Sequence, residues 1–386
     1  MFSYYAEKQN IMAGIYIHIP FCSQKCHYCN FYSSASKKNK PAFVSALLKE
    51  IELQKNYLQD EIVSTIYFGG GTPSLLDIKE LQEIIEKLYQ QYKISEKAEI
   101  TLEANPDDLT NEKLIELSKT AINRLSIGIQ SFDDDDLQYL NRSHSANQAK
   151  EAIKNAQNYG FSNLSIDLIY GIPTLSNDTW AENIEIAINL GIPHISAYCL
   201  TVESGTALDI FIKKGRMLAI DEEKAAQQFD ILMDLLGKHN YIHYEISNFC
   251  KEGFISQHNS NYWKQQKYLG LGPSAHSFNL LSRQWNISNI TNYIQSIENN
   301  KIPCESEVLS LIQQYDEYIL TSLRTIWGVN EHEILNKYGK EIYNYFIQHV
   351  ESFIQKGWVG KKAGIYSLTR QGKYFADGIA SELFFP

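Results

Sequence analysis

Three cysteines lie within eight residues, at Cys22, Cys26 and Cys29, directly after the apolar run 14–21. An odd number of thiols cannot all pair as disulfides, and structural zinc needs four ligands, usually in two separated pairs. The other three cysteines each stand alone, at Cys199, Cys250 and Cys304. Cysteine thiolates hold iron–sulfur clusters, and three of them on a four-iron cluster leave one iron open for a small molecule. The spacing predicts such a cluster, with a structural metal knuckle or chance spacing as the alternatives.

The string from Cys22 to Cys29, C-x-x-x-C-x-Y-C, resembles the cluster motif of the radical S-adenosylmethionine (SAM) superfamily. The residues from Tyr16 to Cys22 (YIHIPFC) are similar to the branch that contains oxygen-independent coproporphyrinogen III dehydrogenase and its heme-chaperone relatives. The resemblance implies a 4Fe–4S cluster on the three thiolates and SAM on the fourth iron. It also implies that an electron from the cluster cleaves SAM to a 5′-deoxyadenosyl radical.

Length and composition set the frame for this chemistry. A chain of 386 residues that is 44% hydrophobic can form one large domain and a smaller one. Its net charge of −10 argues against broad binding to nucleic acids or anionic membranes. The unpaired cysteines indicate a reducing compartment, which we take to be the cytoplasm. We expect neither a secretory signal nor a membrane-spanning helix, and we expect residues 1–12 to be a flexible extension.

Isoleucine-rich segments alternate with helical patterns along the first half of the chain. Expected strands occupy 14–19, 64–68, 99–102, 124–129, 163–169 and 194–200. Between them, residues 78–92 and 180–188 carry apolar side chains at helical spacing. This alternation predicts an α/β fold with a parallel sheet, either a barrel or a partial barrel. The resemblance implies the partial (β/α)6 barrel of radical SAM proteins, which we place at 13–240.

Each expected strand ends in a polar or backbone-accessible group, and parallel barrels form their sites at the carboxyl ends of the strands. Glycine allows close backbone approach, a carboxylate suits the ammonium group of SAM, and a guanidinium suits a carboxylate. From the residues alone, a tight turn, a helix cap and a surface arginine are the alternatives. The resemblance implies a SAM site, with one or two molecules of SAM, at Tyr16, Gly70, Gly71, Thr72, Glu103, Gln130, Arg142, Asp167, Cys199 and His276.

Two other patterns resemble known sites but receive simpler interpretations. Four consecutive aspartates at 133–136 precede an apolar residue, which is typical of a helix N-terminus. The segment 270–275 (GLGPSA) resembles a dinucleotide fingerprint, but we expect no strand before it, and its proline disrupts the required turn.

Residues 241–307 are expected to bridge the barrel and the tail, with a strand at 241–249 and a connection around 285–302. This segment carries the string H-N-x-x-Y-W at His258, Asn259, Tyr262 and Trp263. Imidazole is a common heme ligand, and the aromatic rings offer flat apolar faces. A turn histidine beside core aromatics is the alternative from the residues alone. The resemblance implies heme binding, with His258 on the iron.

The tail, 308–386, shows helical patterns followed by an expected hairpin at 358–368 and a last helix from residue 370. This order predicts a mainly helical, winged-helix-like domain. Lysine plus arginine and aspartate plus glutamate each number 8 from residue 308 onward, so its net charge is zero. A DNA-binding surface is usually basic, so we expect no nucleic acid and interpret the tail as a lid or partner surface.

Three functions remain under comparison. The first is a heme chaperone, with heme and an unidentified acceptor protein as partners. The second is oxygen-independent coproporphyrinogen III dehydrogenase, and the third is a radical enzyme that acts on RNA. The resemblance favours the first, because the dehydrogenase carries a further cysteine where this chain has Phe31. Peripheral membrane association, a homodimer, and whether the chain is an enzyme stay open.

Overall fold

A computed structural model describes residues 12–386, so the expected N-terminal extension lies almost wholly outside the described residues. Six parallel strands form the centre of the molecule, each hydrogen-bonded to the next in chain order. They are β1 (Met12–Ile19), β2 (Ile62–Gly70), β3 (Ile94–Ala104), β4 (Arg124–Gln130), β5 (Leu164–Tyr170) and β6 (His194–Cys199). The predicted α/β partial barrel is confirmed, with all six strands at the expected places.

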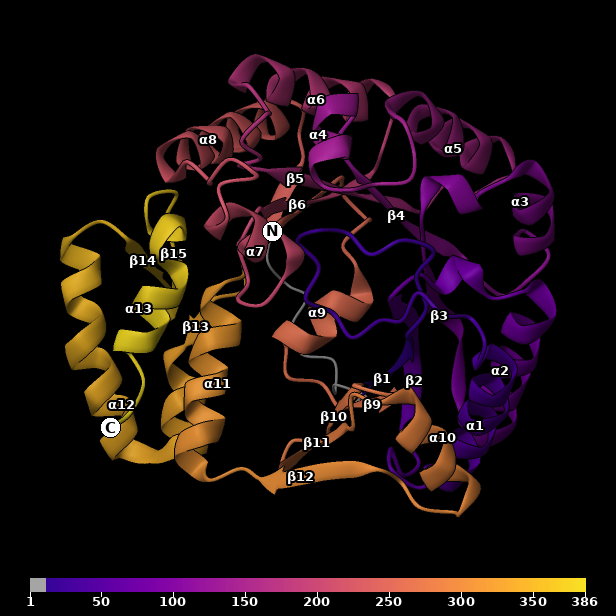
Figure 1. Ribbon diagram of the computed structural model, residues 1–386. Coiled ribbons are helices and arrows are strands. Elements are labelled where there is room, and N and C mark those ends of the chain that lie inside the picture. The colour runs from indigo at the N-terminus through magenta and orange to yellow at the C-terminus, as the bar shows by residue number, and fades with distance from the viewer. Residues whose placement is uncertain (1–11) are drawn as a thin grey trace.

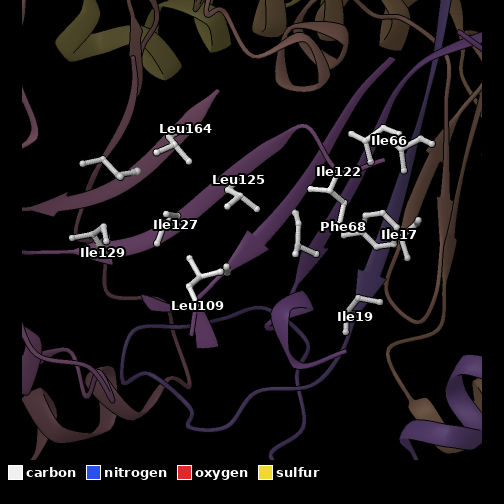
Figure 2. Close-up of a cluster of buried hydrophobic side chains, with 14 of the residues drawn as sticks. Ile17, Ile19, Ile66, Phe68, Leu109, Ile122, Leu125, Ile127, Ile129 and Leu164 are labelled. Atoms are coloured by element: carbon white, nitrogen blue, oxygen red, sulfur yellow. The ribbon is translucent and has the colours of Figure 1, made fainter. Parts of the chain in front are cut away.

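Helices cover the outer face of these strands (Figure 1). They are α1 (Lys40–Leu53), α2 (Ile78–Gln91), α3 (Asn111–Leu117), α5 (Ala146–Asn158), α6 (Asn177–Asn189) and α8 (Glu222–Lys238). Two shorter helices, α4 (Asp134–Tyr139) and α7 (Ala207–Lys213), contact the cysteine loop at His27 instead, and short 3-10 turns lie at Pro73–Leu75 and Pro106–Asp108. The interpretation of the aspartate run is confirmed, because the Asp133 carboxylate accepts N–H bonds at the start of α4. Figure 2 shows apolar side chains of β1, β2 and β4, such as Ile17, Phe68 and Ile127, within the buried core.

Short strands extend the same sheet beyond both edges of the six-stranded centre, in the order β12-β11-β10-β9-β1 on one side and β6-β8-β7 on the other. They are β7 (Ile242–Glu245), β8 (Asn248–Cys250), β9 (Tyr268–Leu271), β10 (His276–Phe278), β11 (Ser282–Asn286) and β12 (Cys304–Val308), with helices α9 (Gln257–Trp263) and α10 (Ile290–Glu298) between them. Most of the segment expected to bridge two domains therefore belongs to the main sheet.

Three local expectations in this segment were wrong. Residues 241–249 are not one strand but part of the β7–β8 hairpin, and the expected connection around 285–302 contains the end of β11 and α10. Gly270 lies inside β9, which pairs in parallel with β1, although no strand was expected there. A Cβ at Gly270 would lie 2.0 Å from the carbonyl oxygen of His276. The glycine therefore permits close approach of the neighbouring chain rather than a phosphate-binding turn.

The tail has its own buried apolar cluster, which includes Ile319, Phe346 and Tyr366. Its elements are α11 (Leu311–Leu323), β13 (Val329–Asn330), α12 (Glu331–Gln355), β14 (Val359–Lys362), β15 (Ile365–Leu368), a 3-10 turn at Gly372–Phe375 and α13 (Ala376–Glu382). The three strands form a small antiparallel sheet in the order β13-β15-β14. At Gly339 the backbone (φ 89°, ψ 174°) interrupts α12, at the boundary between two helical patterns of the sequence. Among residues 12–386, no helix is both long and apolar enough to cross a bilayer.

Candidate functional site

A cavity of about 380 Å³ opens at the carboxyl ends of the six parallel strands. Every strand, or the loop that follows it, contributes to its wall, as the parallel-barrel rule predicts. The cluster and SAM residues expected from the sequence that line it are Cys22, Cys26, Cys29, Gly70, Gly71, Thr72, Glu103, Gln130, Arg142, Asp167 and Cys199. Residues up to 177 positions apart in sequence thus share one site. We refer to this space as the thiol cavity.

The cysteine loop is fixed at its base and partly open toward the cavity. The Cys22 N–H donates to the Ser34 carbonyl at 3.1 Å, so the loop closes onto the end of β1. All three thiols are free and partly buried, and Arg142 Nη1 lies 3.2 Å from Cys26 Sγ. Within residues 12–386 no three metal-binding side chains converge on one ion. A 4Fe–4S cluster instead takes each thiolate on a different iron, so three separated thiols in one cavity fit it.

The glycine turn after β2 brings the ends of two strands into direct contact. Gly70 has φ +108°, and a Cβ there would lie 2.6 Å from the His18 ring. At Gly71 a Cβ would lie 2.6 Å from the Phe21 carbonyl oxygen. Only glycine fits both positions without movement of the cysteine loop, because a side chain would occupy the space of β1. The turn therefore fixes the position of the cysteine loop and also exposes its own backbone to the cavity.

Two partly buried carboxyl groups, Glu103 of β3 and Asp167 of β5, line the same cavity. Tyr67 Oη donates to Glu103 at 2.7 Å and the Gly70 N–H donates at 3.1 Å. Burial, strengthened by the nearby charge of Asp167, raises the pKa of Glu103 to about 7 despite these two donors. Burial likewise raises the pKa of Asp167 to about 6, against the attraction of Arg124 and Arg142. A cationic ligand would restore the charged form of both groups, which suits the ammonium and sulfonium of SAM.

Arg142 links the cysteine loop to β3 and β4. Besides Cys26, its guanidinium donates to Asn105 Oδ1 at 2.7 Å and to the Gly128 carbonyl at 2.8 Å. The residues of the wall that sequence reasoning missed include Ser126 and Gly128. Both precede Gln130 at a spacing of two along β4, so strand alternation was a signal that could have found them. The guanidinium is thus oriented by the strand ends and lies in the wall of the cavity.

His258 lies elsewhere, on helix α9 inside the ring of strands (Figure 1). Its side chain is buried, with Nδ1 2.8 Å from Thr65 Oγ1 and Nε2 2.8 Å from Tyr262 Oη. Burial and the charge of Arg124 lower the pKa of His258 to about 3, so the ring is neutral. Both nitrogens are therefore engaged within the fold. The assignment of His258 to heme iron stays a prediction, and this geometry does not support it.

A second cavity, of about 600 Å³, separates the barrel from helix α11 of the tail. We call it the aromatic cavity, because tyrosine, tryptophan and phenylalanine side chains dominate its wall. Tyr16 and His276, expected at the SAM site, line this cavity, and so do Tyr262 and Trp263 of the heme string. Asn259 is not among the residues that line either cavity. Phe31 lines both cavities, so the two spaces are neighbours.

Comparison with known proteins places these features in a class. The model of the radical SAM superfamily matches residues 16–199. The solved structure of coproporphyrinogen III oxidase (HemN) from Escherichia coli superimposes with a TM-score of 0.83, covering 96% of this chain and 90% of that one. At 19% identity this likeness shows the fold alone. The fold and the thiol cavity thus define a radical SAM protein, and this class implies a 4Fe–4S cluster and SAM as cofactors.

Curated relatives narrow the class further. The heme chaperone HemW of Bacillus subtilis is 33% identical over 95% of this chain and 98% of its own length. HemW of Mycobacterium tuberculosis H37Rv is 30% identical over 96% of this chain and 94% of its own length. HemW of Escherichia coli is 37% identical over 68% of this chain and 69% of its own length. The chain belongs to the family of the heme chaperone HemW.

Proposed function

We propose that this protein is a heme chaperone, which takes up heme and passes it to an acceptor protein. The observation that carries the proposal is the match to HemW of Bacillus subtilis over 95% of the chain. A match of this extent includes the barrel with the thiol cavity, the strands that border the aromatic cavity, and the tail. A likeness confined to the barrel would support only the superfamily, whose members carry out many different reactions.

In this proposal Cys22, Cys26 and Cys29 hold the 4Fe–4S cluster. Glu103 and Asp167 receive the cationic groups of SAM, Arg142 receives its carboxylate, and the turn at Gly70 to Thr72 offers backbone groups to its amino-acid end. The cluster supplies, when bound with SAM, an electron for the reductive cleavage of SAM. The residues of the wall keep SAM oriented in the thiol cavity. We propose that SAM cleavage triggers or gates heme transfer, and is not repeated in a catalytic cycle.

Oxidation of coproporphyrinogen III is the alternative, and one residue speaks against it. Phe31 stands where the resemblance implies a further cysteine in the dehydrogenase, and 69% of its surface is exposed. An apolar ring at this position can neither ligate iron nor transfer a proton. It separates the two cavities instead, as a wall that both share. The similarity to HemN remains a similarity of fold.

We propose a cytoplasmic location, because the thiol cavity requires cysteines that stay reduced. The partners are then heme and an acceptor hemoprotein, with no role for nucleic acid, since the tail carries equal numbers of acidic and basic residues. Membrane association can be tested by flotation of the cofactor-loaded protein with lipid vesicles. Dimer formation can be tested by analytical ultracentrifugation of the same protein.

Anaerobic reconstitution of the full chain with iron, sulfide, SAM and heme tests the proposal. We expect cluster absorption and EPR signals, stoichiometric heme binding, and heme transfer to a heme-free acceptor hemoprotein after addition of SAM and a reductant. The matched control omits SAM. Stoichiometric decarboxylation of coproporphyrinogen III, or no heme binding by the loaded protein, would contradict the chaperone assignment.

A further inference from the structure

We propose that heme binds in the aromatic cavity between the barrel and α11, and that His276 ligates the heme iron there. This inference rests on the proposed heme-chaperone function, and it assigns the heme to a site and to a ligand different from the histidine of the H-N-x-x-Y-W string. Tyr262 and Trp263 of that string become parts of the cavity wall in this assignment.

The size and surface of the aromatic cavity suit a flat macrocycle. Its volume, about 600 Å³, exceeds that of the thiol cavity and falls in the range of roughly 300–1,000 Å³ typical of cofactor sites. The rings of Tyr262 and Tyr268 meet edge to face with centroids 4.6 Å apart, and Phe278 lies 6.2 Å from Tyr268. Such rings offer apolar faces to a porphyrin, and the Tyr262 phenol keeps its hydrogen bond to His258 Nε2.

Three histidines lie in or beside this cavity, and they differ in the state of their ring nitrogens. His18 has Nδ1 3.1 Å from Tyr16 Oη and Nε2 2.9 Å from the Tyr32 carbonyl. His258 is bound at both nitrogens and is only 1% exposed. His276 begins β10 with an exposed side chain, and no side-chain hydrogen bond holds its ring within residues 12–386. Of the three, His276 alone offers a lone pair to iron without breaking the fold.

Packing also holds the His276 ring in place at the cavity. The ring stacks on Trp285 of the adjacent strand β11, with centroids 6.2 Å apart and planes 27° apart. His276 and Trp285 face each other in the β10–β11 ladder, so the backbone fixes their relative position. A ligand on a paired strand keeps its orientation with little loss of side-chain freedom on binding. The imidazole is thus oriented by its strand neighbour while both nitrogens stay accessible.

The aromatic cavity depends on the tail as well as on the barrel. Glu317, Leu320 and Thr321 of α11 form its outer wall. Arg283 of β11 spans the gap, with Nη1 2.6 Å from Glu317 and Nη2 2.6 Å from Glu307. Because Phe31 borders this space and the thiol cavity, a heme bound here would lie beside the cluster and SAM without occupying their site.

The test uses the full-length protein, titrated with ferric heme and, separately, with metal-free protoporphyrin IX. His276→Ala removes the iron ligand and leaves the aromatic wall. We expect its dissociation constant for heme to rise roughly tenfold or more and the imidazole-ligated absorption and EPR spectrum to disappear, while protoporphyrin affinity stays unchanged. Added imidazole should restore the spectrum. His332→Ala, which removes an exposed histidine of α12, is the matched control and should match wild type.

Filling the cavity gives a second, independent result. Leu320→Trp adds bulk to the α11 wall and should weaken the binding of heme and of protoporphyrin alike. Wild type is expected to bind heme with an imidazole-ligated spectrum. The site assignment is overturned if His276→Ala keeps that spectrum, or if a folded His258→Ala protein loses it. If wild type binds no heme, the proposed function itself fails, and the inference fails with it.

Discussion

The two cavities sit side by side but are constructed in different ways. The thiol cavity takes its wall from the carboxyl ends of six long parallel strands and presents sulfur, carboxylate, guanidinium and bare backbone. The aromatic cavity takes its wall from β1 and the cysteine loop on one side and from short later strands, α9 and the tail helix α11 on the other, and presents mainly rings. The difference suggests a division of labour, in which the regular part of the fold holds a small charged ligand and the irregular part holds a large flat one.

Removal of a cluster thiol should have the largest effect, because it should abolish cluster binding in the thiol cavity and leave heme binding in the aromatic cavity intact. In Cys26→Ala we expect loss of the cluster signals, because two thiolates and a neighbouring Arg142 cannot complete the three-thiolate set. Heme binding should persist, since no cysteine lines the aromatic cavity among residues 12–386. Iron and sulfide analysis with absorption and EPR spectroscopy measures both. Cys304→Ala, on β12, is the control and should keep the cluster. If Cys26→Ala lost heme binding together with the cluster, heme and cluster would not occupy independent sites.

Gly70→Ala tests whether the glycine turn positions the cysteine loop. The left-handed backbone alone costs about 1–3 kcal/mol for a residue other than glycine. The clash with the His18 ring adds to this cost, so we expect a loss of about 3 kcal/mol in the free energy of unfolding and weaker SAM binding. Denaturant unfolding and SAM titration measure the two effects.

Gly160→Ala provides the matched control for that substitution. Gly160 has φ +93°, and no atom lies within 4 Å of a Cβ built there, so only the backbone strain applies. Equal destabilisation of the two variants, or normal SAM affinity in Gly70→Ala, would show that the contact between the turn and β1 has no role in the site.

The pKa of Glu103 predicts how SAM affinity depends on pH. Since the pKa is about 7, SAM binding below pH 7 must displace a proton, and affinity should rise with pH up to about 7 and then level off. In Glu103→Gln the step near 7 should vanish and leave a step near 6 from Asp167. Calorimetry of the reconstituted protein between about pH 5 and pH 8, which extends roughly one unit below the lower pKa and one unit above the higher, resolves both steps.

The same pKa sets the contribution of Glu103 to folding. The carboxyl group has a higher pKa in the folded protein than its ordinary value of 4.5, so its stabilising contribution is full below pH 4.5. That contribution is lost as the pH rises through about 7, because the buried group must then carry a charge. SAM affinity that does not change between about pH 6 and pH 8 would contradict the proposed contact of Glu103 with SAM, because a group with a pKa of about 7 must lose its proton over this range.

Arg283→Ala should have the smallest effect on stability and should be confined to the aromatic cavity. Its ion pairs with Glu307 and Glu317 are partly exposed, so we expect a loss of at most about 1 kcal/mol that shrinks further in high salt. Arg370→Ala is the control, because Arg370 follows β15 in the tail and also pairs with two barrel carboxylates, Asp230 and Asp234 of α8, away from the cavity. Only Arg283→Ala should alter the affinity for heme. An equal change of heme affinity in both variants would show that the effect does not arise from the aromatic cavity.

Sequence reasoning found the thiol cavity because its signals are local. The cysteine spacing, the glycine turn, the position of Glu103 near the end of a strand and that of Asp167 within a strand can each be recognised within a few residues, and the parallel sheet brings them together. Ser126 and Gly128 were missed because small residues carry no chemical signal, although their alternation with Gln130 was visible.

The aromatic cavity could not be predicted in the same way. Strands β11 and β12 have the sequences SRQWN and CESEV, without the apolar alternation that identifies a strand. The engagement of His258 depends on Thr65, 193 residues away, and the outer wall belongs to a separate apolar core. Tertiary packing decides such features, so a local string could indicate heme but could not locate its site.

The most direct test is simultaneous loading of one protein sample with cluster, SAM and heme under anaerobic conditions, followed by metal analysis and EPR. We predict about four cluster irons, one SAM and one heme per chain, with neither SAM nor heme displacing the other. Competition between heme and SAM for a single place would contradict the account, as would failure of the wild-type protein to assemble the cluster.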